Sequence, residues 1–409
     1  MDLAELSSWV GNDCLAATES FEIGQDAECG RGLFARSHIK PGTVIMTIPI
    51  SKIITSVMAY ETLTSLNATN WKYRHSLLAT FLVLEKNKGS ASTWHCYIRN
   101  LPEGIPPFME RFLNDGLSDI VTCSLSFGRL KNRIQALISD YETLRVTDPD
   151  LAPNNLQQFL WAVWMVTSRA FALSMPDRTI TGLVPIADLL NHATPCNTSW
   201  SYDHESGMFF VRSVDGIDSG KQITDSYGLK CNSHYFVNYG FAQYENPENE
   251  VTIKLFISDQ DPLRIMKSRL LGFTCKHVHI KSDINSPSFL YCLFILRVIH
   301  AGFKDFASLS NTPKTCGLRP LNINNEVKVL QSLRDGARQG FRCLKQEMDR
   351  VFSKHEHNNA LIICMNGELH LYECIIEFAD YMLHIISCRK RIPHDHRFPD
   401  YFNSISSLF

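Results

Sequence analysis

The sequence lacks a surplus of charge of either sign. Its 40 Lys and Arg residues stand against 42 Asp and Glu residues, so the formal net charge at pH 7 is -2. An obligate nucleic-acid binder usually shows a basic surplus, so direct nucleic-acid binding is not expected. Long apolar runs are missing too. The longest begins at Phe289 and stops at Arg297, which is far short of a membrane span.

The N-terminus lacks a basic start followed by a hydrophobic stretch, so we expect no secretory signal. Cysteine pairs at C-x-x-C spacing are also absent, although 13 cysteines are scattered along the chain. Several of them, such as Cys292, Cys364 and Cys374, lie in apolar runs, which is typical of reduced and mostly buried thiols. We therefore expect a protein of the cytoplasm, the nucleus or both, with no metal site.

Two widespread catalytic motifs are absent. A hydrolase with a nucleophile elbow needs G-x-S-x-G, which does not occur in the chain. The glycines around Arg31 do not form G-x-G-x-x-G at the start of a helix, so a dinucleotide fold is not implied. His277 and His279 could face one side of a strand as metal ligands. Because no Cys or carboxylate follows at the usual spacing, an exposed loop is the better interpretation.

The chain is long enough for two domains, and its apolar period changes along its length. Runs rich in β-branched residues predict strands within 20–56, and again at 208–211 and 251–255. Apolar residues three or four apart predict an amphipathic helix at 130–144. Residues 157–173 are apolar on nearly every face, which predicts a buried helix. From 258 to about 388 the pattern predicts helices throughout.

The predicted fold class is therefore α+β. A β-rich domain is interrupted by a helical insertion and is followed by an all-α domain. We place the first part of the β-rich domain at residues 1–60, the insertion at 61–175 and the second part at 176–257. The helical domain is expected at 258–390, and an irregular tail at 391–409.

The strongest candidate site combines an amide, an imidazole and a phenol. Residues 184–192 form an apolar run that ends on Asn191 and His192, and Tyr227 follows on a turn that ends at Gly228. This combination suits a protein that holds a cofactor and aligns a group transfer. Ordinary capping explains an Asn-His pair about as well, and a buried tyrosine with a satisfied hydroxyl is common.

Two further features are ambiguous by themselves. Gly30 and Gly32 flank Arg31, so the backbone there could pass close to a ligand, but a hairpin turn without a ligand is the simpler interpretation. Arg169 lies in the predicted buried helix and needs a carboxylate partner. That partner could be an Asp or Glu of the protein or the carboxylate of a ligand.

Taken in order, G-R-G-L-F-A, S-R-A-F, A-D-L-L-N-H, D-S-Y-G and N-Y-G-F resemble the motifs of SET-domain protein methyltransferases. The Rubisco large-subunit methyltransferase-like branch is the most similar. It has a helical insertion inside the SET domain and a helical substrate-binding domain after it. The resemblance covers roughly residues 20–390. The cysteine-bearing zinc segment that follows the SET domain of histone-type enzymes is absent, which favours this branch.

The resemblance implies S-adenosylmethionine as the cofactor, and no metal. Arg169 would meet its carboxylate, while Asn191 and His192 would hold its amino group and adenine. Tyr227 and Tyr239 would be catalytic and would line the methyl-transfer channel. The cofactor-binding residues that the resemblance implies are Gly30, Arg31, Gly32, Arg169, Asp188, Asn191, His192, Asn232 and Phe241. The implied partner is a protein, histone or non-histone, and we expect a monomer.

The acceptor side chain depends on two positions. A related branch of the family methylates histidine on actin. Its acceptor pocket has an asparagine two residues after the helix arginine and a tryptophan just before the Asp of the Asn-His motif. This sequence has Phe171 and Ala187 there. Asparagine could hydrogen-bond an imidazole, whereas phenylalanine forms an apolar wall suited to a lysine stem. We therefore expect a protein-lysine N-methyltransferase. The alternatives are a histidine methyltransferase on the same scaffold and a SET-fold binding module without turnover.

Overall fold

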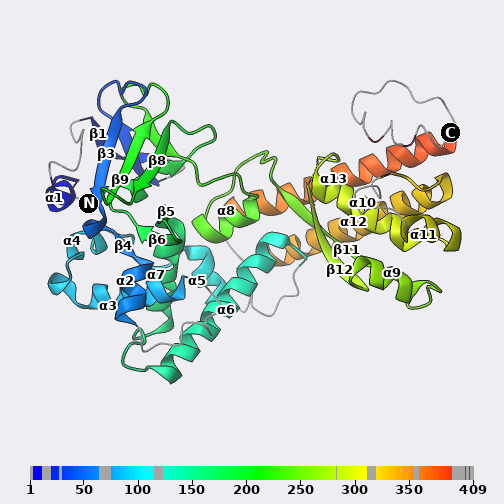
Figure 1. Cartoon of the computed structure of the whole chain (residues 1–409), viewed down its shortest axis with the longest axis horizontal. Coiled ribbons are helices and arrows are strands. Elements are labelled where there is room, and N and C mark those ends of the chain that lie inside the picture. The colour runs from blue at the N-terminus through cyan, green and yellow to red at the C-terminus, as the bar shows by residue number, and fades with distance from the viewer. Residues whose placement is uncertain are drawn as a thin grey trace. The chain divides into compact units, whose positions relative to one another are not determined.

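The chain divides into two compact units (Figure 1). Unit 1 comprises residues 1–114 and 131–229, and unit 2 comprises residues 115–130 and 230–409. The computed structural model describes residues 3–11, 20–26, 30–63, 75–114, 123–281, 283–310, 319–352, 359–388, 401 and 405. Nearly all of the tail predicted at 391–409 lies outside the described residues.

The first sheet of unit 1 has the strand order β1-β2-β10-β7. Its strands are β1 (Phe21–Asp26), β2 (Gly30–Ala35), β10 (Gln222–Asp225) and β7 (Asn191–His192). The β1–β2 and β2–β10 pairs are antiparallel, whereas β10 and β7 run parallel. This topology places the beginning of the chain beside two segments that follow it by about 160 and 190 residues.

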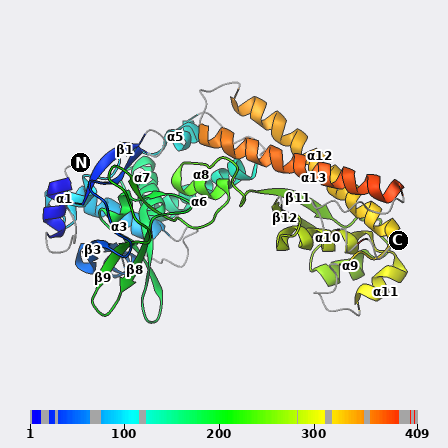
Figure 2. The same cartoon turned by 90° about the horizontal axis from the view of Figure 1, so that it is seen from above.

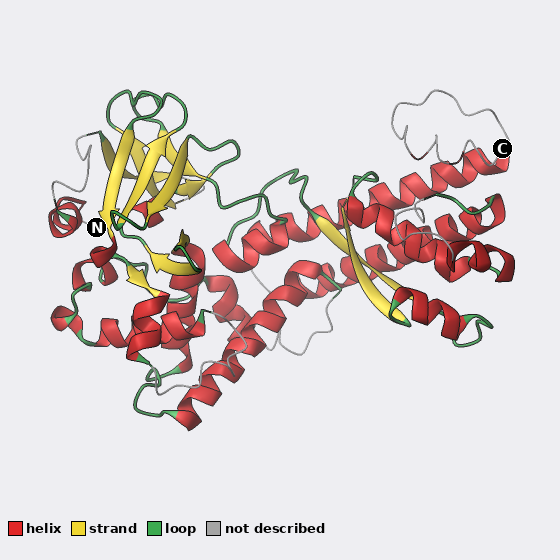
Figure 3. Cartoon of the chain, in the orientation of Figure 1, coloured by secondary structure: helices red, strands yellow, loops and turns green. Residues whose placement is uncertain are grey.

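Two smaller sheets complete the β-rich part of unit 1 (Figure 3). One has the order β3-β9-β8, with β3 (Val44–Pro49), β9 (Met208–Ser213) and β8 (Thr198–Asp203). The other has the order β4-β6-β5, with β4 (Ile54–Thr55), β6 (Thr179–Leu183) and β5 (Ala170–Ser174). Ile45, Ile48, Phe209 and Val211 point into the core and are fully buried, as strands with one covered face require.

The helical insertion is confirmed. In unit 1, α3 and α7 pack against one another through buried residues such as Leu82 and Phe159. Asn155 caps α7 by accepting a hydrogen bond from the Gln158 N–H at 2.8 Å. The helices from the N-terminus to α7 are α1 (Leu3–Val10), α2 (Ser56–Thr62), α3 (Ser76–Asn87), α4 (His95–Ile98), α5 (Pro107–Asn114), α6 (Leu125–Thr147) and α7 (Leu156–Arg169). The first turn of α6 is counted with unit 2.

The buried helix predicted at 157–173 is wrong at its end. Helix α7 stops at Arg169, and Ala170 adopts extended backbone and begins β5. Phe171 therefore lies on a strand, opposite Gly182 of β6. A Cβ at Gly182 would come within 2.8 Å of a Leu173 methyl carbon, so glycine is what lets the two strands pack here. A continuous apolar run has no period that separates a helix from a fully buried strand.

Unit 2 is mainly helical. Its longest elements, α12 (Ile323–Phe352) and α13 (Asn359–Cys388), lie side by side in both views of the chain (Figures 1 and 2). Buried residues such as Leu330, Leu333, Met365 and Ile375 form its core. The shorter helices are α8 (Asn232–Tyr239), α9 (Arg264–Leu271), α10 (Pro287–His300) and α11 (Phe303–Ser310). The helical domain predicted after residue 258 is thus confirmed in its main elements.

One strand in this domain was not predicted. Residues Cys275–Lys281 form β12, which pairs antiparallel with β11 (Glu250–Phe256). The exposed loop predicted around His277 and His279 is therefore wrong as a structure, although both side chains are exposed. Val278 and Ile280 alternate with them and are buried, which gives the period of two of a half-covered strand.

Metal-binding clusters and membrane spans were not expected from the sequence. In the described ranges, the structure has no group of three or more His, Cys, Asp and Glu side chains that could hold a metal ion. Within the same ranges, no helix is both long enough and apolar enough to cross a membrane.

A buried ion pair ties α10 to α12. Arg297 donates from Nε and Nη2 to the two carboxylate oxygens of Glu326 at 2.9 and 2.7 Å. Both side chains are at most 1% exposed, and the Tyr401 hydroxyl donates to the same carboxylate at 2.5 Å. Burial alone would lower the pKa of Arg297, but the hydrogen bonds and charge of Glu326 raise it above its ordinary value. The guanidinium is therefore charged and depends on Glu326.

Candidate active site

The Asn191 amide connects three strands of the first sheet. Residue pairing places Asn191 beside Thr224 of β10. Its Nδ2 donates to the Arg31 carbonyl at 3.1 Å and to Gln222 Oε1 at 2.9 Å. The structure thus brings together Arg31 and Asn191, which the sequence analysis assigned to one cofactor site from separate motifs.

The two glycines beside Arg31 have different structural roles. Gly30 has φ +77°, a conformation that favours glycine, at the start of β2 in the β1–β2 hairpin. At Gly32, a Cβ would lie 2.7 Å from Asn191 Nδ2 and 3.1 Å from Gln222 Oε1. The antiparallel pairing of β1 and β2 confirms the hairpin, and Gly32 additionally leaves room for the Asn191 amide.

Gly32→Ala tests that close approach. We expect the new methyl group to displace the Asn191 amide and to weaken binding of S-adenosylmethionine at least about tenfold, which corresponds to about 1.4 kcal/mol. Calorimetric titration measures the affinity. Gly302→Ala is the matched control, because a Cβ at Gly302 meets nothing nearer than 3.9 Å. Unchanged affinity in Gly32→Ala would show that the Asn191 position does not matter for the cofactor.

Arg169 has a carboxylate partner within the protein. Its Nη1 donates to Asp188 Oδ2 at 3.1 Å and to the Asp188 carbonyl at 3.0 Å. The Tyr97 hydroxyl donates to the same Oδ2 at 3.1 Å, and the Asp188 side chain is only 3% exposed. The structural ion pair considered for Arg169 is therefore present, and Tyr97 joins it from α4.

Positive charge nevertheless exceeds negative charge around this ion pair. Burial raises the pKa of Asp188, and Arg169 opposes that effect. Burial lowers the pKa of Arg31, with a further contribution from the Arg169 charge. Two guanidinium groups thus interact with one carboxylate, and Arg169 Nε is buried without a hydrogen-bond partner among the described residues. A ligand carboxylate would balance the second guanidinium charge.

Backbone strain precedes Asp188. Ile186 is fully buried and has φ 68° and ψ -47°. The Ala187 N–H donates to the Pro185 carbonyl at 2.8 Å, so Ile186 is the central residue of a γ-turn with positive φ. A β-branched residue is strained there. The turn leads directly into the 3-10 helix Ala187–Leu189, which carries Asp188.

Comparing Ile186→Gly with Ile186→Ala isolates this strain. At an ordinary position glycine is less stable than alanine by about 0.5–1 kcal/mol. At a positive φ we expect the glycine variant to be at least as stable as the alanine variant. Chemical denaturation of the two proteins gives the difference in free energy of unfolding. A glycine variant that is less stable by 1 kcal/mol or more would contradict a strained turn.

His192 and Tyr227 form one unit. The Tyr227 N–H donates to His192 Nδ1 at 3.1 Å, and the rings stack with centroids 5.3 Å apart. Because Nδ1 accepts, we assign the proton of a neutral imidazole to Nε2, which faces Thr194 Oγ1 at 3.4 Å. The Tyr227 hydroxyl donates to the Leu190 carbonyl at 2.7 Å. Both side chains are therefore fixed by backbone groups of the same motif pair.

Asp225 is a second buried acid of this region. It pairs with His192 across β10 and β7, and burial raises its pKa from an ordinary 3.8 to about 6, against a hydrogen bond from the Ser226 backbone. A raised pKa means that the folded protein prefers the protonated acid. The contribution to stability is therefore complete below pH 3.8 and is lost as the pH rises through about 6.

Asp225→Asn should remove this pH dependence. The change in pKa corresponds to about 3 kcal/mol at most. We expect the variant to be more stable than the wild type at pH 8 and to converge with it near pH 4. Urea unfolding of both proteins at a series of pH values measures the difference. Parallel curves from pH 4 to 8 would show that Asp225 titrates normally.

Phe171 and Ala187, from which a lysine acceptor is predicted, lie in different surroundings. The Phe171 ring meets Trp200 edge-on at 5.3 Å and Phe209 at 5.1 Å between centroids. Ala187 is fully buried at the start of the 3-10 helix. Trp200 was missed by sequence reasoning, although its place in the alternating stretch T-S-W-S-Y-D predicts an inward-facing side chain.

The remaining predicted residues belong to unit 2. Tyr239 and Phe241 have centroids 6.1 Å apart, and Phe241 stacks on Tyr235 at 4.9 Å. Gly240, with φ 83°, ends α8 and allows this reversal of the chain.

Asn232 braces the chain that follows α8. Its Oδ1 accepts hydrogen bonds from the Gln243 N–H and Asn246 Nδ2, and its Nδ2 donates to the Gln243 carbonyl. Its contribution to cofactor positioning, proposed from the resemblance, would therefore act through the segment that carries Phe241.

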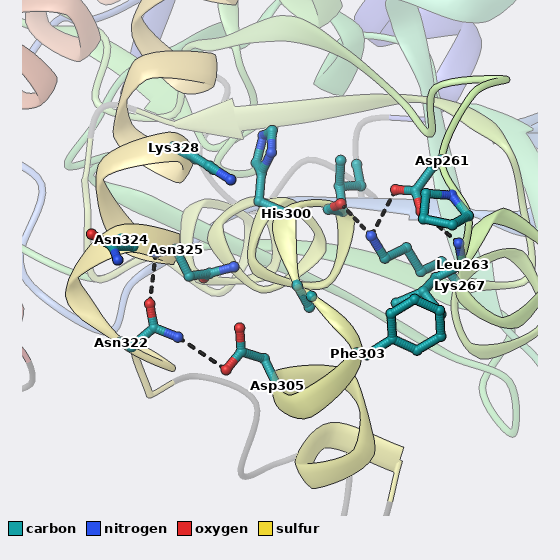
Figure 4. A pocket seen from close by; sticks show the side chains of 14 residues that line it. Asp261, Leu263, Lys267, His300, Phe303, Asp305, Asn322, Asn324, Asn325 and Lys328 are labelled. Atoms are coloured by element: carbon teal, nitrogen blue, oxygen red, sulfur yellow. Dashed lines mark hydrogen bonds and ion pairs between the residues drawn. The ribbon is translucent and has the colours of Figure 1, made fainter.

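A separate cavity of about 550 Å³ lies in unit 2 (Figure 4). Lys267 projects into it, buried, and donates to Asp261 at 2.7 Å and to the Ile299 carbonyl at 2.8 Å. None of the residues predicted for the site lines this cavity. A single buried lysine in a short helix gives no periodic signal, so the sequence did not point to it.

Comparisons with known proteins agree with the resemblance found in the sequence. The family model described as SET domain matches residues 30–228. Two solved structures, Rubisco LSMT bound to AdoMet and the LSMT SET domain bound to lysine and AdoHcy, match with TM-scores of 0.71 and 0.74. They are 19% identical to this chain and cover 99% and 97% of it, and the chain covers 99% and 95% of them. This likeness confirms the predicted fold class.

The matches to curated relatives cover only part of each relative's length. Ribosomal lysine N-methyltransferase set10 of Schizosaccharomyces pombe is 25% identical over 59% of this chain and 45% of its own length. Actin-histidine N-methyltransferase of Gallus gallus is 26% identical over 72% of this chain and 52% of its own length. The chain thus spans about half the length of these two relatives.

Proposed function

We propose that the chain is a SET-domain protein-lysine N-methyltransferase that uses S-adenosylmethionine, because the SET domain model matches residues 30–228. The observation that carries this proposal is the arrangement around Asp188, where two guanidinium groups interact with one carboxylate. A zwitterionic amino-acid ligand presents the carboxylate that this arrangement lacks.

The residues of unit 1 fit the rest of such a cofactor. Arg169 and Arg31 would hold its carboxylate, and the Asn191–His192 strand would offer backbone groups to its amino group and adenine. Tyr227 and His192 stack side by side at the end of this strand. Bound there, the cofactor supplies an electrophilic methyl group on a sulfonium. The protein's task is then to orient an amine in line with that methyl group.

Tyr227 is suited to orient the amine. Its hydroxyl proton is engaged by the Leu190 carbonyl, so the oxygen presents its lone pairs to an N–H donor. The acceptor must be neutral to attack, although free lysine has a pKa of about 10.4. An apolar wall formed by Phe171 and Trp200 would lower that pKa by desolvation.

A lysine acceptor is supported by Phe171. Its ring packs edge-on against two other aromatic rings and carries no hydrogen-bonding group. Such a wall suits the methylene stem of lysine, whereas an imidazole nitrogen needs a polar partner. Histidine methylation remains the second candidate, because actin-histidine N-methyltransferases are among the relatives at 26% identity.

Labelling of a cell lysate with methyl-labelled S-adenosylmethionine tests the proposal. We expect the chain to add label to lysine side chains of one or a few proteins. Calorimetry with the cofactor, run in parallel, distinguishes an enzyme from a binding module. Cofactor binding without any transfer would support the binding module and contradict the proposal.

A further inference from the structure

Helix α13 repeats one pair of side chains. His370 and Cys374 stand four residues apart, as do His384 and Cys388. Residues four apart lie on the same face of a helix. The second pair follows the first by 14 residues, or about four turns, so both pairs point to roughly the same side. All four residues belong to unit 2 and to one continuous helix.

The atoms of each pair are already close together. Cys374 Sγ lies 3.6 Å from His370 Nε2, and Cys388 Sγ lies 3.6 Å from Nε2 and 3.8 Å from Nδ1 of His384. In a tetrahedral zinc site, bonds of about 2.3 Å to sulfur and about 2.05 Å to nitrogen separate these two atoms by about 3.6 Å. The first pair therefore has the spacing of two ligands on one zinc ion. In the second pair the sulfur is nearly as close to one ring nitrogen as to the other, so the exposed His384 ring must turn before Nε2 and the thiolate can share a metal ion.

The first pair is accessible to a metal ion. The His370 side chain is 75% exposed, so a metal ion can reach its ring from solvent. Binding would release the thiol proton of Cys374 to solvent.

We propose that α13 carries two surface sites for Zn²⁺, one at each His-x-x-x-Cys pair. Each site supplies one imidazole nitrogen and one thiolate, and water occupies the other two positions. The described residues include no group of three or more such ligands, so these sites are open rather than closed structural ones. The proposal is independent of methyl transfer. A His-x-x-x-Cys pair brings its two side chains together only on a helix. The C-x-x-C spacing considered in the sequence therefore did not reveal these pairs.

Titration of the untagged, reduced chain with Co²⁺ tests the sites. Cobalt replaces zinc in such sites, and its bond to thiolate gives a charge-transfer absorption. We expect the wild type to bind two more equivalents than Cys374→Ser/Cys388→Ser and each single variant to lose one. Zinc should abolish the absorption by competition. Circular dichroism checks that helix content is unchanged, as expected for side chains on an exposed helix face.

The matched control keeps both thiols. In His370→Asn/His384→Asn we expect the same loss of two equivalents as in the cysteine variant. Equal metal uptake by the wild type and the double cysteine variant would overturn the proposal. Undiminished uptake by the double histidine variant would also overturn it, because thiols alone would then explain the binding.

Discussion

Replacing Tyr227 by phenylalanine should lower kcat for methyl transfer by about 100-fold or more, as is typical when a polar group that orients the reacting atoms is removed. The loss has two sources. The oxygen that would align the amine disappears, and so does the hydrogen bond to the Leu190 carbonyl at 2.7 Å. The Tyr227 N–H bond to His192 and the ring stacking remain, so affinity for S-adenosylmethionine should change only a few-fold.

Single-turnover kinetics on a labelled protein acceptor measures this effect, and calorimetry measures cofactor affinity. Tyr60→Phe is the matched control, because Tyr60 lies on α2 and is 61% exposed. We expect wild-type rates for that variant. If Tyr227→Phe keeps more than half of the wild-type kcat, Tyr227 is not the orienting residue. A proportional loss of cofactor affinity would instead indicate a binding role.

Glu326→Ala should reduce the free energy of unfolding by about 3–5 kcal/mol, which is the second large effect we expect. The substitution leaves Arg297, only 1% exposed, as an uncompensated buried charge. It also removes the acceptor of the Tyr401 hydroxyl, which ties the end of the chain to this cluster. Chemical denaturation followed by circular dichroism measures the change.

An exposed ion pair provides the control. Arg36 and Glu22 are paired at 3.1 Å, but both side chains are more than half exposed, so Glu22→Ala should cost less than about 1 kcal/mol. The double variant Arg297→Met/Glu326→Leu should recover most of the lost stability, because an apolar pair carries no desolvation cost. Equal losses for Glu326→Ala and Glu22→Ala would contradict the account of the buried pair.

Much of the fold can be predicted from the spacing of apolar residues along the chain. The helices at 130–144 and along α12 and α13 show spacing of three and four residues, and the strands β3, β9 and β11 are rich in β-branched or aromatic residues. The failures have a common cause. At the α7–β5 junction and at β12, pairing with another strand decides the local structure, and the sequence of one segment does not identify its partner.

The sequence motifs identified the candidate residues but not the contacts between them. A buried arginine in a helix requires a carboxylate. The sequence around Arg169 does not identify Asp188, 19 residues further on, as that partner. Tyr97 joins the same carboxylate from the helical insertion and belongs to no motif. The strained backbone at Ile186 cannot be predicted from the sequence either, because isoleucine is an improbable residue for a positive φ. Such features depend on tertiary structure that overrides local preference.

Mapping the methylated atom tests the central claim most directly. A lysate lacking this protein is incubated with S-adenosylmethionine and either the wild-type chain or the Tyr227→Phe variant, and new marks are located by mass spectrometry. The account predicts N-methyl-lysine in the wild-type sample and a strong reduction with the variant. Marks confined to histidine would contradict the lysine assignment that rests on Phe171, and the absence of any mark despite cofactor binding would contradict catalysis.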